Sequence, residues 1–448
     1  MNPLLAAVRA RLERLFSDPV RLVPLGYAFY VTLGWGLLLL PICQRGEATA
    51  TWLDHLFTTV SAVSTTGLVT VPTGATYTGA GQLVILLLMQ LGGLGYMTLG
   101  SFTVLSVTGR LPALREKVGA TALSLPAGFA VGPFLRVVVL FTLSIEILGA
   151  LALTPVFAAR GVEHPVWEAV FHSVSAFCTA GFGLYGDSFE SFRGDLWLNT
   201  IISILSYLGA IGFIVAADCW AFVRGRKAWL TLTSKIILVS TAWIVVLGTL
   251  LFATTEPSIA TLPLGERWMT AFFQVMSAST TVGFNTVPVG ALSASSVLLL
   301  TIAMVIGASP SGTGGGIKTT SLTALWAVML AVARRRSQVR FLHREVPDAR
   351  VRAAVANVTL YSLTLCAGIY ALTLVETAPV ADLVFEGASA LGTVGLSRGI
   401  TGALSAAGKS ILIALMFLGR VGPLALGMAL VSRSSLDDTN HPEEDVAL

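Results

Sequence analysis

Charge is what this sequence lacks most. Only 12% of its 448 residues are Asp, Glu, Lys or Arg, whereas about 25% is usual in soluble domains. Hydrophobic residues make up 54% of the chain, and the mean hydropathy is +0.80. This composition excludes an ordinary soluble protein and predicts a polytopic membrane protein. We expect its spans to be all α-helical, because helices satisfy their own backbone hydrogen bonds in lipid.

Cysteine and histidine are also scarce. The four cysteines stand singly without CxxC spacing, so they indicate neither a disulfide framework nor a zinc site. The five histidines show no ligand spacing, and the chain has no nucleophile motif, nucleotide fingerprint or cofactor motif. We therefore expect no enzyme activity, no cofactor held by this chain and no nucleic-acid partner.

One short motif occurs four times. SAVSTTGL at 61–68 returns as SAFCTAGF at 175–182, SASTTVGF at 277–284 and SALGTVGL at 389–396, and a Phe stands four residues before each copy. The shared glycines are 114, 102 and 112 residues apart, a period too long for a solenoid of small stacked units. The chain is therefore expected to contain four sizeable repeats.

Each repeat has the same order of apolar segments. A long run is followed by a short segment that ends in the motif, and then by a second long run. The first runs are 22–42, 134–158, 234–253 and 354–375; the short segments are 51–66, 166–180, 267–282 and 381–394; the second runs are 82–108, 196–223, 294–330 and 408–431. The short segments cannot cross ~30 Å of hydrocarbon, so they are expected to be re-entrant half-helices.

This order predicts eight spans and four re-entrant pore helices around one pseudo-fourfold pore. The expected repeats are 22–109, 110–224, 225–333 and 354–432. An N-terminal segment at 1–21, a basic loop at 334–353 and a polar tail at 433–448 complete the chain.

The distribution of charge predicts the orientation. Twenty Lys and Arg residues lie in the N-terminal segment, the inter-repeat loops and the tail, against six in the loops beside the motifs. The positive-inside rule therefore predicts that both termini and the inter-repeat loops are cytoplasmic. The opposite side carries twelve acids and a local balance of −6. These acids could form an electrostatic funnel for cations, or cap short helices and hydrate the surface.

The repeated motif has a chemistry of its own. Four Thr-x-Gly turns at the ends of half-helices could meet around one axis and replace the hydration shell of potassium with backbone carbonyls. Glycine permits the positive φ that such carbonyls need. Close packing of small residues in a non-transporting scaffold is the alternative. The predicted potassium ligands are the carbonyls of Thr65, Thr66, Gly67, Thr179, Ala180, Gly181, Thr281, Val282, Gly283, Thr393, Val394 and Gly395.

Two further stretches are unusual for membrane spans. GASPSGTGGGIKTTS at 307–321 interrupts an apolar run, and irregular backbone at membrane depth must lie beside protein or a water-filled cavity. We expect this loop to line a pathway; a kinked helix without a gating role is the alternative. Arg420 is expected some twelve residues into a span, where an ionisable group indicates a functional role. A structural salt bridge is the alternative, and the two are compatible.

Together these stretches resemble the Trk/Ktr/HKT superfamily of potassium-uptake proteins over essentially the full chain. The resemblance rests on the four motifs, on 307–321 and on MFLGRVGPLALG at 416–427. It implies potassium uptake gated by the loop 307–320 beneath the filter, with Arg420 just below. The gating residues would be Gly307, Gly312, Gly314, Gly315, Gly316, Lys318 and Arg420. Only a short segment precedes the first repeat, which favours the Ktr-type membrane subunit.

The resemblance also implies partners. Bacterial members are inner-membrane homodimers that work with a cytosolic, RCK-type, KtrA-like subunit, an octameric ring that binds ATP/ADP or NAD. The basic loop 334–353 either contacts that ring or is simply a solvated loop.

One glycine per filter predicts loose discrimination against sodium, although by the same resemblance a glycine at Gly67 favours potassium. A sodium-permeable or non-selective channel, and sodium as an activating or coupling ion, stay open.

Overall fold

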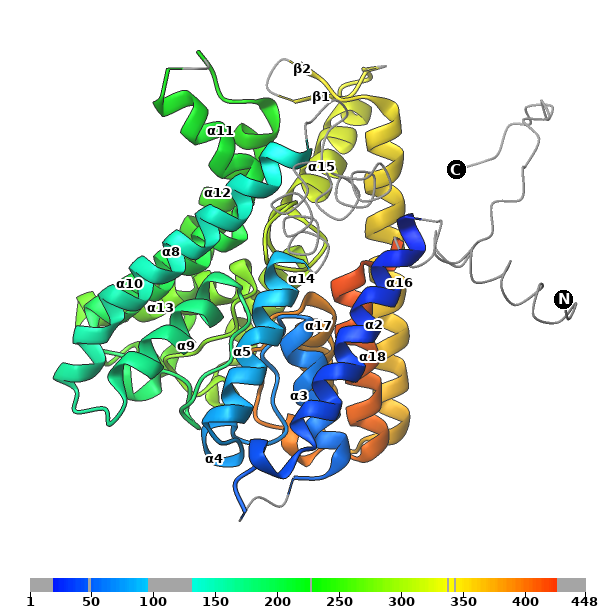
Figure 1. The fold of residues 1–448 in the computed structure, drawn as a ribbon. Helices are drawn as coiled ribbons and strands as arrows, with labels where there is room; N and C mark the ends of the chain where they lie inside the picture. Colours follow the sequence, from blue (N-terminus) through cyan, green and yellow to red (C-terminus); the bar gives the residue numbers. More distant parts are fainter. Residues whose placement is uncertain are drawn as a thin grey trace, which may run out of the picture.

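The computed structural model describes residues 19–46, 50–95, 131–225, 228–336, 338–341 and 344–424, which are almost entirely helical (Figure 1). By length and apolar character, three described helices can each cross a membrane: α8 (Val131–Ala159), α12 (Leu232–Thr255) and α16 (Asp348–Val375). The helices α10 (Leu196–Ala210) and α11 (Phe213–Val223) form a bent pair that can act as a fourth span. The chain is thus a helical membrane protein.

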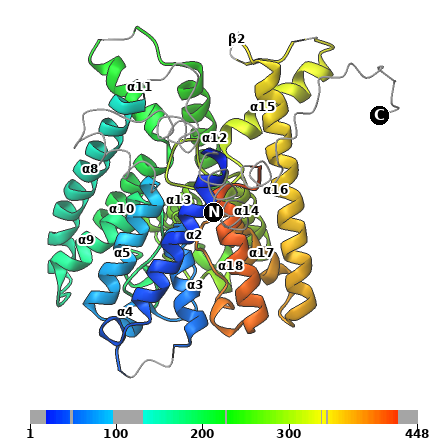
Figure 2. The same ribbon diagram turned by 45° about the vertical axis from the view of Figure 1, so that its right-hand side comes forward.

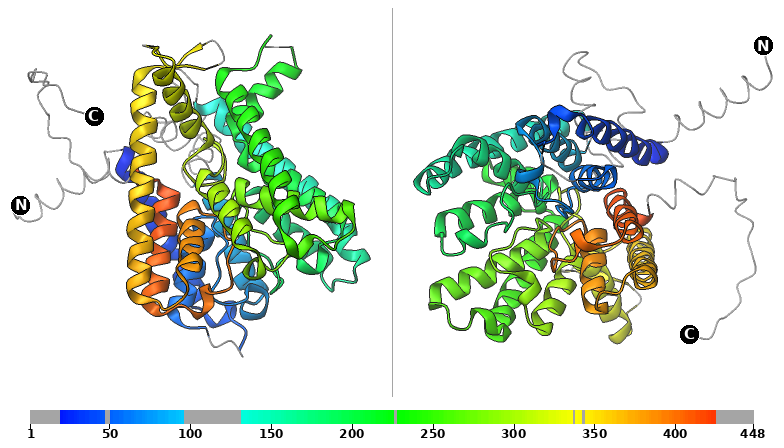
Figure 3. Two further views of the ribbon diagram at one scale, coloured as in Figure 1. Left: turned by 180° about the vertical axis from the view of Figure 1, so that it is seen from behind. Right: turned by 90° about the horizontal axis from the view of Figure 1, so that it is seen from below.

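The four repeats surround a common centre. Viewed from below, the blue, green, yellow-green and orange parts of the chain follow one another around it (Figure 3, right). The remaining helices are α2 (Pro19–Leu38), α3 (Trp52–Val63), α4 (Thr73–Thr76), α5 (Gly79–Leu94), α9 (Pro165–Phe177), α13 (Leu264–Thr280), α14 (Ala294–Ile306), α15 (Thr319–Ala333), α17 (Val380–Gly392) and α18 (Ala406–Val421). Short 3-10 turns lie at Pro41–Cys43, Glu190–Phe192, Pro257–Ile259, Val289–Ala291 and Thr401–Ala403.

The short helices α3, α9, α13 and α17 confirm the predicted half-helices. They have 12 to 17 residues, which gives them lengths of about 18 to 26 Å at 1.5 Å per residue. They are mostly buried, and each contributes residues to hydrophobic clusters that join neighbouring repeats. Each ends at the repeated motif, so the motifs lie in the interior of the ring.

The end of the first long helix is joined to the start of the second by similar contacts in repeats three and four. Glu256 accepts hydrogen bonds from the backbone N–H (3.1 Å) and hydroxyl (2.8 Å) of Ser293, which caps α14. Glu376 does the same for Ser405, the cap of α18, at 2.9 and 2.7 Å. A carboxylate at the end of the first long helix therefore holds the start of the second long helix, where negative charge is favourable.

Within the described residues, the second helix of every repeat ends at a glycine, whereas the sequence predicted an interruption only in repeat three. Each helix ends just before a glycine with positive φ: Gly95 (77°), Gly212 (97°), Gly307 (68°) and Gly422 (88°). A helix cannot continue through that backbone conformation. The predicted run 196–223 has the bounds of α10 and α11 together, but the bend of 98° between these two helices was not predicted. Beyond Gly95 and residue 424, the predicted runs to 108 and 431 lie outside the described residues.

A pattern L-G-x-x-G precedes three of these breaks, at 91–95, 208–212 and 418–422. Its first glycine faces the carbonyl of a residue at the end of the short helix. A Cβ would lie 2.2 Å from the Val63 oxygen if built on Gly92, 1.9 Å from that of Phe177 on Gly209, and 2.1 Å from that of Leu391 on Gly419. No larger residue fits without moving backbone, so these glycines let the short helix pack directly on the second helix.

The basic loop is more structured than predicted. Two strands, β1 (Arg340–Phe341) and β2 (Arg344–Glu345), pair antiparallel with Arg340 opposite Glu345. Helix α16 then begins at Asp348, six residues before the predicted start at 354. In Figure 1 this hairpin lies at the same end of the molecule as α11. Most of the predicted N-terminal segment and all of the polar tail lie outside the described residues.

Candidate functional site

The four motif loops, 65–67, 179–181, 281–283 and 393–395, meet in cyclic order. Each motif glycine approaches a carbonyl of the next repeat so closely that a side chain is excluded. A Cβ built on the glycine would lie 2.4 Å (Gly67 to Ala180), 2.3 Å (Gly181 to Val282), 2.1 Å (Gly283 to Val394) and 2.2 Å (Gly395 to Thr66) from that oxygen. The ring therefore closes from repeat one through repeat four back to repeat one.

All four motif loops share one backbone conformation. The Thr two residues before each glycine has positive φ: 53° at Thr65, 50° at Thr179, 61° at Thr281 and 48° at Thr393. Such angles are uncommon for residues with a Cβ and cluster at functional sites. The next residue donates its N–H to the carbonyl of the first motif Ser, at 2.8 Å for Thr66 and Ala180, 3.1 Å for Val282 and 2.9 Å for Val394. The structure thus brings all twelve predicted ligand residues together.

The first Ser of the motif supports the glycine in two repeats. The Gly67 N–H donates to the Ser61 hydroxyl at 3.0 Å, and the Gly395 N–H donates to the Ser389 hydroxyl at 3.1 Å. The hydroxyls of Ser175 and Ser277 are buried and have no partner among the described residues. The ring is therefore only pseudo-fourfold, as the unequal motif sequences predicted.

The loop 307–318 lies directly against this ring. It contacts the positive-φ Thr of every motif loop. Thr313 bonds Thr65 (3.5 Å, through its carbonyl) and Thr179 (3.1 Å, through its hydroxyl). The N–H of Gly315 donates to the Thr281 hydroxyl at 3.0 Å. A Cβ built on Gly315 would lie 2.2 Å from the Thr393 hydroxyl oxygen. The loop closes one end of the ring in this structure.

The loop 307–318 is hydrogen-bonded to the break in the second helix of repeat two. The carbonyls of Gly209 and Ala210, at the end of α10, accept hydrogen bonds from the N–H groups of Thr313 (3.1 Å) and Ser309 (3.2 Å). The loop thus satisfies helix-end groups that otherwise lack partners. The two ends of the loop also lie close together, because a Cβ built on Gly307 would lie 2.6 Å from the Cα of Gly316.

Arg420 lies in the last turn of α18, fourteen residues after its start at Ala406, close to the predicted depth of some twelve residues. Its guanidinium donates to the carbonyls of Thr313 and Gly92, and to that of Gly93 at 3.3 Å. No acid within the described ranges forms an ion pair with it, so the predicted salt bridge is not seen there. Lys318 similarly donates to the carbonyl of Gly314. Two cations thus hold the loop through its carbonyls.

A cavity of about 700 Å³ lies on the other side of the loop. Six of the seven predicted gating residues line it: Gly312, Gly314, Gly315, Gly316, Lys318 and Arg420. Phe341 and Glu345 of the hairpin also line it. Irregular backbone is therefore found beside a cavity, as its presence at membrane depth requires. Thr313 was missing from the prediction, because its contacts join residues more than 100 positions apart.

Residues 36–436 match the family model TrkH, described as a cation transport protein. The chain belongs to this family of cation transport proteins. It is 33% identical to the potassium/sodium uptake protein NtpJ of Enterococcus hirae, over 98% of this chain and 99% of that one. It is 34% identical to the Ktr system potassium uptake protein B of Vibrio alginolyticus, over 92% and 90% of the two chains.

The fold agrees with this membership. The crystal structure of the potassium transporter TrkH from Vibrio parahaemolyticus superposes with a TM-score of 0.72, at 21% identity, over 93% of this chain and 85% of that one. The predicted family and fold class are therefore confirmed. The protein is a membrane cation transporter and not an enzyme.

Proposed function

We propose that this chain is the potassium-translocating subunit of a Ktr-type uptake system in a bacterial inner membrane. The observation that carries the proposal is the closed ring of four motif loops with a glycine-rich loop against one end of it. Potassium would lose its water to the carbonyls of the twelve motif-loop residues. The names of the relatives, which are potassium or potassium/sodium uptake proteins, support the same cargo.

The loop 307–318 would be the gate. It contacts all four motif loops, so an ion could not leave the ring on this side without displacing it. Arg420 would act twice, by holding the Thr313 carbonyl and by placing a positive charge in the path of a cation. Opening would then require the loop to leave both the threonines and Arg420.

Sodium is the second candidate cargo. One positive-φ glycine per motif loop leaves few stacked carbonyl rings, which is expected to weaken discrimination between the two ions. The relative in Enterococcus hirae is named for both ions. Sodium could be carried in place of potassium, or it could activate or couple to potassium uptake.

The proposed partner is a cytosolic regulatory subunit. Relatives named as Ktr system proteins belong to systems of more than one component, and we infer an octameric, KtrA-like ring of RCK type that binds ATP/ADP or NAD. The hairpin 340–345 would transmit its state, because this hairpin lines the cavity beside the loop. Both termini would be cytoplasmic, and the subunit would form a homodimer.

The test is transport by Gly395→Ser and Gly399→Ser. Both glycines have positive φ, but only Gly395 faces a carbonyl; nothing lies within 4 Å of a Cβ on Gly399. The wild type and Gly399→Ser should restore growth of an uptake-deficient bacterium at low potassium, given a matching regulatory subunit. Gly395→Ser should insert normally and lose preference for potassium over sodium in liposomes.

Two results would contradict the proposal. If Gly395→Ser transported with unchanged selectivity, the ring would not be the filter. If the well-inserted wild type gave neither rescue nor flux, the four repeats would form a scaffold instead. Repeating the growth test with and without sodium separates an activating role of sodium from simple permeation.

A further inference from the structure

One column of the short helices is polar although it is fully buried. It holds the residue directly after the fixed Phe, namely Thr58, His172, Gln274 and Glu386, each with an exposed fraction of 0%. Burying a polar group is unfavourable unless it is hydrogen-bonded. Apolar residues would fill this position without that penalty, so the polarity of the column needs an explanation.

The explanation lies twelve residues further along each repeat, at the third residue after the motif glycine. In three repeats the column residue is hydrogen-bonded to it. His172 Nε2 accepts from the Leu184 N–H at 3.3 Å, Gln274 Nε2 donates to the Thr286 hydroxyl at 3.1 Å, and Glu386 Oε1 accepts from the Arg398 N–H at 3.0 Å. No such bond joins Thr58 to Thr70, although both are described. The contact recurs at the same place, but a different side-chain type (imidazole, amide or carboxylate) makes it in each of the three repeats.

These bonds hold the far end of each motif loop. The near end is held by the short helix, from which the loop emerges at the positive-φ Thr. The column residue reaches past the loop to the chain that leaves it. Each of these motif loops is therefore fixed at both ends by its own short helix, and the column residue is a strut between the two.

The strut in repeat four is the most developed. Glu386 also accepts hydrogen bonds from the hydroxyls of Ser397 and Thr401, the latter at 2.8 Å. Repeat four therefore has three donors on one buried side chain, where repeats two and three have one strut bond each.

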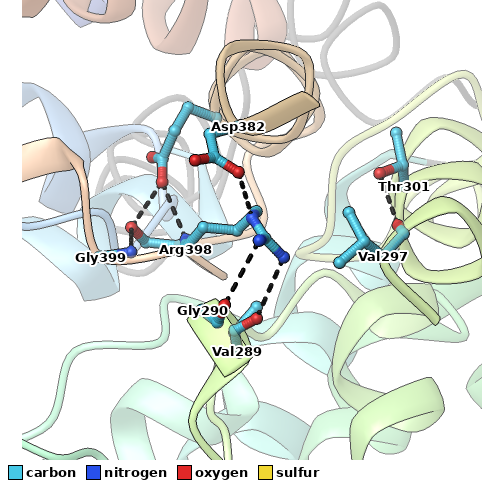
Figure 4. A network of polar contacts seen from close by, with 9 residues as sticks. Val289, Gly290, Val297, Thr301, Asp382, Arg398 and Gly399 are labelled. Atoms are coloured by element: carbon cyan, nitrogen blue, oxygen red, sulfur yellow. Dashed lines mark hydrogen bonds and ion pairs between the residues drawn. The ribbon is translucent and has the colours of Figure 1, made fainter. Parts of the chain in front are cut away.

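Arg398 extends this strut to the neighbouring repeat (Figure 4). Its guanidinium pairs with Asp382 and donates to the carbonyls of Val289 (3.4 Å) and Gly290 (3.3 Å) in repeat three. Glu386 holds the backbone of Arg398, while Asp382 holds its side chain. The position of the motif loop in repeat four is thus tied to repeat three through one residue.

We propose that His172, Gln274 and Glu386 are positioning residues that set ion selectivity by fixing the far ends of the motif loops. This rests on the proposed function, in which the loop carbonyls bind the ion. The spacing and rigidity of coordinating carbonyls bear on the choice between potassium and sodium. Glu386 has the largest effect, and the motif loop of repeat one lacks the strut.

The first test is Glu386→Gln. Glutamine has nearly the same shape, but its single carbonyl oxygen cannot replace two carboxylate oxygens, and its NH₂ group would face a donor. Preference for potassium over sodium in liposomes should fall by about three- to tenfold, the loss expected for one or two hydrogen bonds. Potassium flux at saturating concentration should stay close to wild type. Glu376→Gln is the matched control, because Glu376 bonds Ser405 at the start of α18 rather than a motif loop, and it should keep the wild-type preference.

The second test is Thr286→Val, which removes the partner of Gln274 while keeping its shape. Its matched control is Thr301→Val, because the Thr301 hydroxyl bonds only the carbonyl of Val297 in its own helix, at 2.7 Å (Figure 4). Thr286→Val should lower the selectivity ratio, and Thr301→Val should not. This variant keeps the proposal testable if Glu386→Gln does not fold.

Three outcomes distinguish the struts from the filter itself. If Glu386→Gln and Thr286→Val keep the wild-type ratio while Gly395→Ser loses it, the struts serve packing alone and this proposal is wrong. If neither strut variant accumulates in the membrane, the column serves folding, which also overturns it. If Gly395→Ser too keeps the ratio, the proposed function fails first.

Discussion

At the scale of one residue, Thr313 makes more hydrogen bonds between the loop 307–318 and its surroundings than any predicted gating residue. Its carbonyl accepts from Arg420, and its hydroxyl bonds Thr179 and the carbonyl of Phe177, both at 3.1 Å. Arg420 of α18 therefore bonds the Thr313 backbone, while the end of α9 and the motif loop of repeat two bond its side chain. Thr313 is neither a glycine nor a charged residue, so nothing in the sequence singled it out.

Thr313→Val should make the closed loop easier to open. The substitution keeps the shape and the carbonyl but removes two hydroxyl contacts, each worth about 0.5 to 1.5 kcal/mol. We expect potassium flux without a regulatory subunit to rise by about two- to tenfold in liposomes. Thr323→Val is the control, since its hydroxyl bonds the Thr319 carbonyl within α15. Equal basal flux in both variants would show that the Thr313 hydroxyl does not hold the gate.

The residue scale also shows what a sequence can and cannot reveal. Gly67 and Gly395 were predictable, because a glycine that recurs in four copies indicates a backbone requirement. The partners of Arg420 were not predictable, since a local pattern cannot show that its guanidinium meets carbonyls of Gly92 and Thr313. An arginine in an apolar run suggests a charge that needs an acid, and here carbonyls of the loop 307–318 and of the last turn of α5 take the place of that acid.

At the scale of the element, the short helices were predicted well and the broken helices poorly. A short helix is visible because apolar residues stop at a polar motif. The break at Gly212 is hidden because Ile211 and Phe213 beside it are apolar, so hydropathy follows one continuous run. The pattern L-G-x-x-G was present in three repeats, but small residues in spans equally indicate close helix packing. In this structure they serve both purposes.

Gly209→Ala tests the close approach of short and second helices. The new Cβ would lie 1.9 Å from the Phe177 carbonyl and 2.8 Å from the Thr313 hydroxyl, so backbone must move. We expect a loss of about 1 to 3 kcal/mol in the free energy of unfolding, as for other overpacked sites. Thermal unfolding in detergent is the measurement.

Gly36→Ala is the matched control for this variant. Gly36 is also helical, in α2, and nothing lies within 4 Å of its added Cβ. Alanine there should be neutral or slightly stabilising, because it is the better helix former. Equal midpoints for the two variants would mean that the backbone at Gly209 yields freely, and the packing argument would be wrong.

At the scale of the whole molecule, the ring must close between the last repeat and the first. Helix α18 lies beside α2 and α3 (Figure 2). Lys409 of α18 pairs with Asp54 of α3 at 2.9 Å, and their side chains are only 15% and 7% exposed. The same carboxylate caps α3, because it accepts from the Thr51 N–H at 2.9 Å. One ion pair thus joins residues 355 positions apart and fixes the start of a short helix.

Removing either partner should destabilise the ring more than removing both. Asp54→Asn or Lys409→Met leaves a largely buried group unpaired, which typically costs about 3 to 5 kcal/mol. The double variant should recover part of that loss, since no lone charge then remains. Thermal unfolding of the four proteins in detergent at pH 7 gives the coupling directly. If the two single losses simply add, the pair does not act as a unit.

The same pair predicts how stability depends on pH. Burial opposes ionisation of Asp54, but hydrogen bonds from Lys409 and Thr51 outweigh it and hold the pKa of Asp54 below its ordinary value. The folded state therefore binds the proton less readily than the unfolded state. The stability from this carboxylate is complete above the unfolded pKa and is lost as pH falls toward the folded one. The wild type should lose more stability than the Asp54→Asn, Lys409→Met double variant between pH 7 and pH 3. Parallel losses would instead assign acid unfolding to other carboxylates.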